Sequence, residues 1–261
     1  MQLKNARILL TGASGGLGQE LARQFTDAGA ALLLAGRDSV RLTALSAALG
    51  AGAAKVCADL ERPAGVATLA GAAREFGVNV LINNAGVSAF GLFENQDAAA
   101  LTRLLATNLE APMQLTRALL PWLKAQPQAA IVNIGSTFGS LPFPGFVAYS
   151  AAKAGLRGFS QALRRELSDS LVAVIHIAPR AIDTPLNSDA VKALNRALRT
   201  ASDPPQEVAR QVVAALRSGH GEHHFGFPER LFAWLNGVAP SLIDRALAGK
   251  LTTIKQHSPS S

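Results

Sequence analysis

Hydrophobic residues along this chain follow two alternating patterns. Short runs are apolar almost throughout, which is typical of parallel β-strands covered on both faces; they occupy residues 6–10, 31–35, 53–58, 78–82, 129–134 and 171–178. Longer stretches have an apolar residue every three or four positions and predict helices over residues 16–28, 40–49, 64–76, 98–124 and 149–168. Because strands and helices alternate, we expect an α/β fold with a doubly wound parallel sheet, flanked by helices and joined by right-handed crossovers.

The end of the chain departs from this alternation. We expect one α/β domain over residues 1–227, in which residues 184–199 form a mobile helical segment and residues 204–217 a helix that begins at two prolines. Residues 228–261 mix apolar side chains with Arg230, Arg245 and Lys250. This mixture predicts an amphipathic tail that packs on the body or on a neighbouring subunit, with contact to a membrane surface as the alternative. Residues 257–261 are expected to be disordered.

The composition narrows the class of protein. Of 261 residues, 49% are hydrophobic and 16% are charged, which suits a folded α/β protein and not a disordered chain. The net charge of +7 is spread without a long basic run, so we expect it to attract an anionic small molecule rather than nucleic acid. The apolar run at residues 8–10 is too short for a signal peptide, and no run approaches the ~20 residues of a membrane span. We therefore expect a cytoplasmic protein.

Cysteine and histidine offer little chemistry in this sequence. Cys57 is the only cysteine, so no internal disulfide can form, and its apolar neighbours predict a buried strand residue rather than a nucleophile. His220, His223 and His224 cluster near the expected last strand. No acid or cysteine completes a metal-ligand set around them, so no metal site is predicted.

A glycine-rich turn joins the first expected strand to the first expected helix. It reads Thr11-Gly12-Ala13-Ser14-Gly15-Gly16-Leu17-Gly18. In this position, backbone N–H groups and a helix N-terminus face a ligand, which suits the pyrophosphate of a dinucleotide. The candidate contacts are Gly12, Ser14, Gly16, Leu17 and Gly18, and a purely structural turn is the alternative. The spacing differs from the Gly-x-Gly-x-x-Gly fingerprint of dinucleotide-binding proteins.

The end of the second strand indicates which dinucleotide binds. An acid that accepts from the ribose 2′-hydroxyl of NAD is usual here, whereas this chain has Gly36 followed by Arg37. A guanidinium can pair with a 2′-phosphate, so NADP(H) is the expected cofactor, although Arg37 could also be a solvated residue. The next residue, Asp38, is expected near the N-cap of the second helix.

Polar residues also follow the third and fourth strands. Asp59 and Leu60 follow the third strand, and Asp59 is either an acceptor for the adenine amino group or a helix N-cap. Asn83-Asn84-Ala85-Gly86 ends the fourth strand, where Asn84, Ala85 and Gly86 suit a tight turn beside the cofactor; a generic turn is the alternative.

The most informative pair of residues is Tyr149 and Lys153. They lie four residues apart on an expected helix, so their side chains share one face. Tyr149 is the only tyrosine, and its phenol is a poor acid or base at neutral pH unless its pKa of about 10 is lowered. A neighbouring ammonium would lower that pKa. Ser136 follows the fifth strand and could donate a hydrogen bond to a substrate oxygen as charge develops there.

These motifs together resemble those of the short-chain dehydrogenase/reductase family. The matching pieces are Thr11-Gly12-x-x-x-Gly16-x-Gly18, Asn83-Asn84-Ala85-Gly86, Ser136 and Tyr149-x-x-x-Lys153, in family order and spacing, over roughly residues 5–220. The resemblance implies a Rossmann-type fold of about seven parallel strands. It also implies hydride transfer between NADP(H) and a carbonyl or alcohol substrate.

The resemblance also assigns roles to residues. It implies that Tyr149 exchanges the proton, that Ser136 orients the carbonyl oxygen, and that Lys153 binds the nicotinamide ribose and lowers the pKa of Tyr149. It adds Asn108, which would hold a water between the lysine and solvent, and it places Pro179, Ile182 and Thr184 at the cofactor. Arg180 stands where the family usually has glycine. Relatives suggest a homodimer or homotetramer formed through the helices that carry Asn108 and Tyr149.

The substrate is indicated only by the loop after the fifth strand. Phe138, Leu141, Phe143 and Phe146 follow Ser136 closely, which favours a hydrophobic aldehyde, ketone or acyl-type carbonyl. Packing of these rings on the protein itself is the alternative. Other functions remain open from sequence alone: an NADP(H)-binding sensor or scaffold without turnover, a lipid-binding protein of membrane surfaces, or an epimerase or dehydratase.

Overall fold

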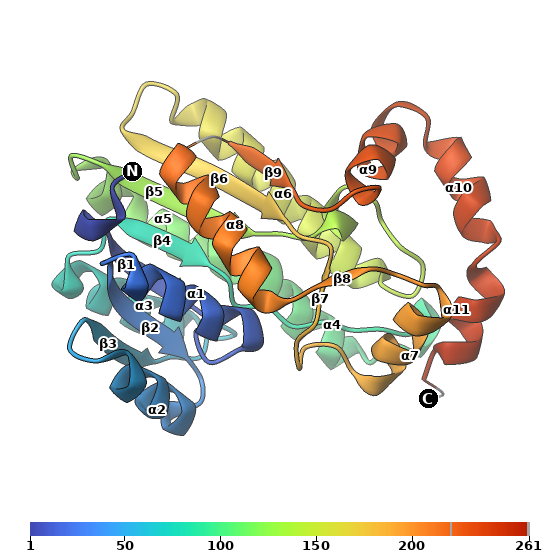
Figure 1. Ribbon diagram of the computed structural model, residues 1–261, viewed down its shortest axis with the longest axis horizontal. Helices are drawn as coiled ribbons and strands as arrows, with labels where there is room; N and C mark the ends of the chain where they lie inside the picture. Colours follow the sequence, from blue (N-terminus) through green and yellow to red (C-terminus); the bar gives the residue numbers. More distant parts are fainter. Residues whose placement is uncertain (220, 260–261) are drawn as a thin grey trace.

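The computed structural model describes residues 1–219 and 221–259. Its central sheet has seven strands in the order β3-β2-β1-β4-β5-β6-β9, and every neighbouring pair is parallel (Figure 1). The strands are β1 (Arg7–Thr11), β2 (Ala31–Gly36), β3 (Ala53–Cys57), β4 (Val80–Asn83), β5 (Ala129–Ile134), β6 (Val172–Ala178) and β9 (Glu222–His224). The doubly wound parallel sheet predicted from the sequence is confirmed. The strand order changes direction between β1 and β4, which is where such sheets bind ligands at their carboxyl ends.

Helices cover both faces of this sheet. One face carries α1 (Gly16–Asp27), α2 (Ser39–Leu49) and α8 (Pro205–Ser218), and the other carries α3 (Pro63–Phe76), α5 (Ala111–Lys124) and α6 (Val147–Glu166). Successive strand residues point to opposite faces. On β1, Ile8 and Leu10 therefore pack against the first group of helices, whereas Leu9 packs against the second. Both faces being apolar explains why the strands read as continuous hydrophobic runs.

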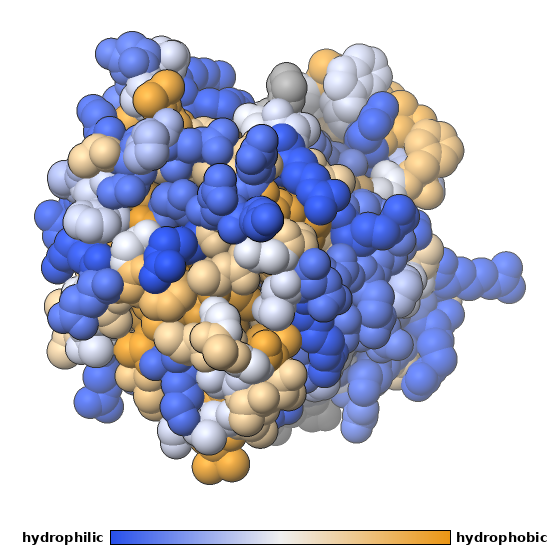
Figure 2. Space-filling model, turned by 60° about the vertical axis from the view of Figure 1, so that its left-hand side comes forward, coloured by the Kyte–Doolittle hydropathy of each residue, from blue (hydrophilic) through white to orange (hydrophobic). Residues whose placement is uncertain are grey.

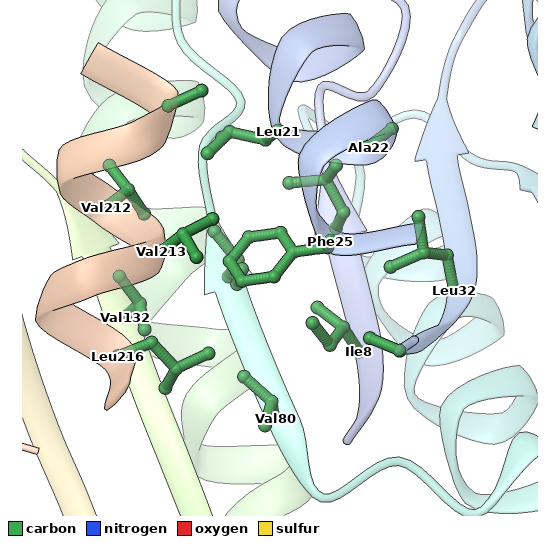
Figure 3. Packing of buried hydrophobic residues seen from close by; sticks show 14 of the residues in the cluster. Ile8, Leu21, Ala22, Phe25, Leu32, Val80, Val132, Val212, Val213 and Leu216 are labelled. Carbon is green, nitrogen blue, oxygen red and sulfur yellow. The ribbon is translucent and has the colours of Figure 1, made fainter. Parts of the chain in front are cut away.

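The core on the first face joins the two ends of the domain. Phe25 of α1 is fully buried and lies between α8 and the sheet, close to Val213, as Figure 3 shows. Ile8, Val80 and Val132 supply the sheet side of the same cluster. Truncating such an aromatic residue to alanine costs about 3–5 kcal/mol of folding free energy. Helix α8 thus ties the later part of the chain to its first βαβ unit.

One predicted helix is interrupted. Residues 98–124 form α4 (Ala98–Leu105), a π-helical turn η3 (Ala106–Glu110) and α5, not a single regular helix. A π-turn inserts one residue into the helical repeat and is frequent at functional sites. Here the inserted turn contains Asn108, whose side chain is fully buried.

Two other elements differ from the sequence expectation. The segment predicted to be helical over residues 184–199 is helical only in α7 (Asp189–Ala197), because Ser188 caps the helix by accepting from the N–H of Val191. Before and after it, the two-residue strands β7 (Ala181–Ile182) and β8 (Ser202–Asp203) pair in parallel. The remaining short elements are the 3-10 turns η1 (Leu3–Asn5), η2 (Phe93–Asn95) and η4 (Thr137–Gly139).

Cys57 is exposed, which corrects the expectation of a buried residue. It ends β3, the edge strand of the sheet, where alternate side chains face solvent. Its Sγ lies 3.2 Å from the carbonyl oxygen of Arg37. Asp38 was expected near the N-cap of α2, and this is confirmed, since its carboxylate accepts from the N–H of Arg41 at 2.9 Å.

The chain ends in three helices that we call the C-terminal arm: α9 (Glu229–Val238), α10 (Pro240–Ala248) and α11 (Leu251–His257). The arm leaves the sheet after β9 and curves around the far end of the molecule until α11 packs against α7 (Figure 1). His257 belongs to α11, and the N–H of Ser258 donates to Ile254, so helix extends into the segment expected to be disordered. Residues 260–261 of that segment lie outside the described residues.

The surface keeps some apolar side chains. Figure 2 shows a face on which hydrophilic residues surround a central group of apolar ones. On the arm, Leu231, Phe232, Trp234, Val238 and Leu242 are exposed. None of the described helices combines the length and the apolar character needed to cross a membrane.

Candidate active site

The first turns of α6 bring together the pair predicted from its four-residue spacing. Lys153 is buried; its Nζ donates to the carbonyl oxygen of Ile134 at 2.9 Å and lies 5.7 Å from the centre of the Tyr149 ring. Ile134 is the last residue of β5, and Ser136 follows it at the start of η4. The phenol, the ammonium and the Ser136 hydroxyl therefore meet at the carboxyl edge of the sheet.

The protonation behaviour of Tyr149 differs from the sequence expectation. Burial raises the pKa of Tyr149 above its ordinary value, and the hydrogen bond with Ser136 offsets only part of this rise. Burial also lowers the pKa of Lys153 to about 8. Both shifts have the same cause, because a buried site disfavours the phenolate and the ammonium alike. The pair therefore favours a neutral phenol that can donate its proton.

Asn108 supports the same site from η3. Its Nδ2 donates to the carbonyl oxygen of Val87 at 2.7 Å, and its Oδ1 accepts from the N–H of Val87 at 2.8 Å. A Cβ placed on Gly86 would lie 3.1 Å from Asn108 Oδ1 and 3.8 Å from Lys153 Nζ. Asn108 thus fixes the loop that follows β4 beside Lys153. The sequence placed Asn108 only through family resemblance, because its π-turn has no clear pattern of its own.

The glycine-rich turn has the close contacts of a ligand cradle. Gly12 has φ +64°, and a Cβ there would lie 2.8 Å from the Cα of Ala85. A Cβ on Gly18 would lie 2.1 Å from the carbonyl oxygen of Gly12. Gly15 caps α1 without a side chain, so the N–H groups of the first turn are open to a ligand. This turn fits a dinucleotide pyrophosphate, which needs donors and room at a helix N-terminus.

Asn84 holds this turn in place. Its Nδ2 donates to the carbonyl oxygens of Thr11 at 2.9 Å and Gly12 at 3.2 Å. The N–H groups of Asn84 and Ala85 both donate to Thr11 Oγ1 at 3.0 Å. The ends of β1 and β4 are therefore cross-linked beneath the cradle. This brings the predicted Asn84, Ala85 and Gly86 next to the glycine turn.

Residues after β2 and β3 form the other end of the cradle. Arg37 is exposed and pairs with Glu61, with Nη1 2.7 Å from Oε1. Ser14 lies close by, since a Cβ on Gly36 would be 3.3 Å from its Oγ. Asp59 accepts from the N–H of Glu61. Asp59 is not the N-cap of α3; that position belongs to Arg62, which makes no capping bond.

The loop after β6 closes over the glycine turn. The carbonyl oxygen of Pro179 accepts from both N–H and Oγ1 of Thr137, which anchors the loop to η4. Thr184 is buried, and a Cβ on Gly16 would lie 2.9 Å from its Cγ2. Ile182 lies between them in β7. The structure therefore gathers the predicted Pro179, Ile182 and Thr184 at the entrance to α1. The predicted Leu17 packs in the core on the first face of the sheet, and Leu60 packs against the core on the second face.

Arg180, which replaces a glycine usual in the family, is an anchor. Its Nε and Nη2 donate to the two carboxylate oxygens of Asp203 at 3.0 Å and 2.6 Å. Its Nη1 lies 3.5 Å from Glu229 Oε2, at the first residue of the arm. One guanidinium thus joins the loop after β6, β8 and α9. Sequence reasoning missed these partners, because nothing in the local pattern relates the three segments.

An aromatic cluster lies against Tyr149. Phe138 and Phe143 stack with ring centres 5.2 Å apart, and Phe146 stacks on Phe90 at 5.0 Å. Phe138 meets the Tyr149 ring edge-on at 6.3 Å. Three of these rings were predicted near Ser136, whereas Phe90 was not; Leu141 lies outside the cluster. Aliphatic residues complete it from far along the chain: Val191, Leu194, Leu198 and Ile254.

Ile254 brings the C-terminal arm into this site. It lies on α11 and is fully buried within the aromatic cluster. A Cβ on Gly145 would lie 2.7 Å from Phe90 Cε2 and 3.2 Å from Ile254 Cγ2. The arm therefore packs on the body at its end. The sequence could not show this contact, because Ile254 is a single apolar residue in an amphipathic tail.

Among the described residues, no group of three or more His, Cys, Asp or Glu side chains could hold a metal ion. His224 pairs with Glu222 at 2.9 Å. His220, the first of the three histidines noted in the sequence, lies outside the described residues.

Comparison with known proteins agrees with this geometry. The family model for short chain dehydrogenases matches residues 6–195. The chain is 35% identical to dehydrogenase/reductase SDR family member 7B of Bos taurus, over 95% of this chain and 82% of that protein. It is 32% identical to the 3-oxoacyl-acyl-carrier-protein reductase FabG of Vibrio cholerae, over 81% of this chain and 90% of that protein.

Solved structures lead to the same result. A short-chain dehydrogenase/reductase of Burkholderia phymatum in complex with NAD has a TM-score of 0.84 and 25% identity, over 93% of this chain and 96% of that one. A short-chain dehydrogenase of Sphingobium yanoikuyae in complex with NADPH has a TM-score of 0.79 and 31% identity, over 98% and 99% of the two chains. The chain therefore belongs to the short-chain dehydrogenase family and is an oxidoreductase that transfers a hydride between a nicotinamide dinucleotide and CH–OH or C=O groups.

Proposed function

We propose that this protein uses NADP(H) to interconvert a hydrophobic carbonyl compound and its alcohol, with Tyr149 as the acid and base. The observation that carries the proposal is the position of Tyr149. Its ring lies beside Lys153 on one side and against a wall of phenylalanines on the other. A proton donor that adjoins an apolar wall suits a substrate whose carbonyl is attached to an apolar body.

Each residue of the site has a separate role in this proposal. The cofactor supplies or accepts the hydride. As a carbonyl is reduced, the neutral phenol of Tyr149 donates its proton to the oxygen, and Ser136 donates a hydrogen bond to the same oxygen. Lys153 binds the nicotinamide ribose and stabilises the phenolate that remains. Asn108 belongs to this catalytic set because it holds the backbone of Val87, and with it Gly86, beside the ammonium.

The preference for NADP(H) rests on the basic end of the cradle. Arg37 lies after β2, near Ser14, and its present partner Glu61 is part of an exposed ion pair that contributes little stability. A 2′-phosphate would offer Arg37 a stronger partner through paired, charge-assisted hydrogen bonds. The Sphingobium yanoikuyae relative is in complex with NADPH, whereas the Burkholderia phymatum relative is in complex with NAD. Asp59 and Leu60 would face the adenine, and Pro179, Ile182 and Thr184 the nicotinamide.

The proposed substrate is an aldehyde, ketone or acyl-type carbonyl with a long or ring-bearing apolar part. Phe90, Phe138 and Phe143 are half-buried and offer such a part an apolar surface. Phe146 and Ile254 are buried and support these rings from within the cluster. The reductase of Vibrio cholerae takes, by its name, a 3-oxoacyl group carried on a protein. We extend only the apolar carbonyl class to this chain.

We also propose a cytoplasmic homodimer or homotetramer. The helices expected to form the contact carry exposed apolar residues: Leu105 on α4, Met113 on α5 and Val147 on α6. Light scattering of the purified protein tests the assembly, and a monomer at micromolar concentration would reject it.

The decisive experiment is NADPH oxidation with straight-chain aldehydes and ketones of increasing length, and with NADH in parallel. We expect kcat/KM to rise with chain length. The variant Tyr149→Phe should bind NADPH normally and lose at least roughly 100-fold in kcat. Turnover close to the normal rate in this variant would reject the role of the phenol, and a preference for short polar carbonyls would reject the apolar substrate.

A further inference from the structure

A second groove lies between the body and the start of the C-terminal arm. Its volume is about 500 Å³, which is the size of pocket that holds a small molecule. It shares no residue with the site around Tyr149. Body and arm both line it: Ser140, Arg157 and His224 on one side, and Phe227, Arg230, Leu231, Ala233 and Trp234 on the other.

Two buried polar atoms of this groove lack partners among the described residues. Ser140 is 8% exposed, and its Oγ makes no hydrogen bond. The Nδ1 of His224 is also buried without a partner, while its Nε2 pairs with Glu222. Leaving a buried polar group unpaired is unfavourable, so such groups usually meet a ligand or water. Both atoms belong to residues that line one groove, which points to a polar ligand group there.

Glu222 pairs with both Arg157 and His224, so the cation of the groove that remains for a ligand is Arg230. Arg230 lines the groove and is exposed, and it has no carboxylate within ion-pair distance in the described part of the chain. Arg157 donates to Glu222 through Nε at 2.5 Å. This hydrogen bond does not use the two terminal nitrogens of Arg157, which can donate to other acceptors. A guanidinium offers five donors in a planar fork that matches a carboxylate. The polar end of the groove therefore favours an anion.

The rest of the groove is apolar and open. Phe227 is 76% exposed, Trp234 is 64% exposed, and Leu231 is 47% exposed. These three side chains line the groove on the arm side. Exposed apolar surface of this kind is removed from water when an apolar ligand covers it. The groove thus combines a cationic head region with an aromatic and aliphatic wall.

We propose that this groove binds a single anionic amphiphile of the fatty-acid type. The carboxylate lies at Ser140 and Arg230, and the alkyl chain lies along Leu231 and Trp234. This binding is separate from hydride transfer, because none of these residues contacts Tyr149 or the glycine turn.

The test is calorimetric titration of the full chain with dodecanoate below its micellar concentration. We expect one site per chain. The neutral analogue dodecanol should bind at least about fivefold more weakly, because it lacks the charge that Arg230 would pair with. Arg230→Gln should weaken dodecanoate binding roughly fivefold to tenfold. The matched variant Arg245→Gln changes an exposed arginine of the same arm that does not line the groove, and it should bind dodecanoate like the parent.

Trp234 provides a second measurement. Dodecanoate should change the tryptophan fluorescence of the parent, and this change should disappear in Trp234→Phe, which keeps Trp122 as the remaining tryptophan. Equal affinity for dodecanol, or equal loss in the Arg230 and Arg245 variants, would overturn the proposal. Absence of binding below the micellar concentration, with binding only to anionic vesicles, would also overturn it in favour of a membrane surface.

Discussion

Arg180 and Asp203 form a two-pronged ion pair between the loop after β6 and strand β8, and the same guanidinium reaches the C-terminal arm at Glu229. Nε and Nη2 of the guanidinium reach the two oxygens of the carboxylate at 3.0 Å and 2.6 Å, and Nη1 lies 3.5 Å from Glu229. The hydrogen bond to Asp203 raises the pKa of Arg180, so the guanidinium stays charged. A glycine at this position could make none of these contacts. The arm is therefore attached to the loop that covers the entrance of α1.

Replacing Arg180 should loosen the arm. Arg180→Met leaves Asp203 and Glu229 without their cation in a largely buried position, and we expect a loss of about 2 kcal/mol in the free energy of unfolding. KM for an apolar carbonyl should rise more than kcat falls, because the arm supports the aromatic rings of the site through Ile254 and supplies no reacting group. Urea denaturation and steady-state kinetics measure both effects. Arg210→Met breaks an exposed pair with Glu207 on α8 and is the control; equal effects of the two variants would contradict the coupling.

The pair of Arg37 and Glu61 should decide between the two dinucleotides. Arg37→Ala should weaken NADPH binding by roughly 1.5–3 kcal/mol and leave NADH binding unchanged. Glu61→Gln removes the competing carboxylate and should tighten NADPH binding slightly. Fluorescence titration with both cofactors measures these affinities. Arg41→Ala, on the exposed side of α2, serves as the matched control. A similar loss for NADPH and NADH in Arg37→Ala would show that Arg37 does not contact the 2′-phosphate.

Ile254 should set the fit of the apolar substrate. Its side chain is fully buried among the rings next to Tyr149, so Ile254→Ala opens a cavity and should cost about 2–5 kcal/mol of stability where the arm is docked. We expect kcat/KM to fall more for long carbonyls than for short ones. Lys255→Ala changes the exposed neighbour and should leave the ratio of these rates intact. A uniform loss across all chain lengths would indicate that Ile254 supports stability alone.

His176 should make the protein less stable in acid. It is buried on β6, and desolvation lowers the pKa of His176 to about 3. The unfolded chain binds this proton at a pKa near 6.5. Above pH 6.5 His176 is neutral in both states, and its burial does not reduce the stability. As the pH falls from about 6.5 towards 3, only the unfolded chain binds the proton, so the free energy of unfolding decreases, by about 2 kcal/mol at pH 5. Urea unfolding of the parent and of His176→Gln at both ends of this range measures the difference. Equal pH dependence of the two proteins would contradict this assignment.

The sequence by itself determined most of the framework. Strand and helix periodicities were sufficient for the parallel sheet, because residues such as Ile8, Leu9 and Leu10 are apolar on both faces. The four-residue spacing of Tyr149 and Lys153 was sufficient to place both on one helix face. These features depend on neighbours within a few residues, which a linear pattern records.

The tertiary structure decided what depends on distant neighbours. Burial set the direction in which the pKa of Tyr149 moves, and the edge position of β3 exposed Cys57. The π-turn placed Asn108 against Val87, and the curved arm brought Ile254 to the aromatic rings beside Tyr149. Arg180 found Asp203 and Glu229 on other elements. Each of these outcomes is a matter of desolvation or of contacts between remote segments, and local propensity carries no information about either.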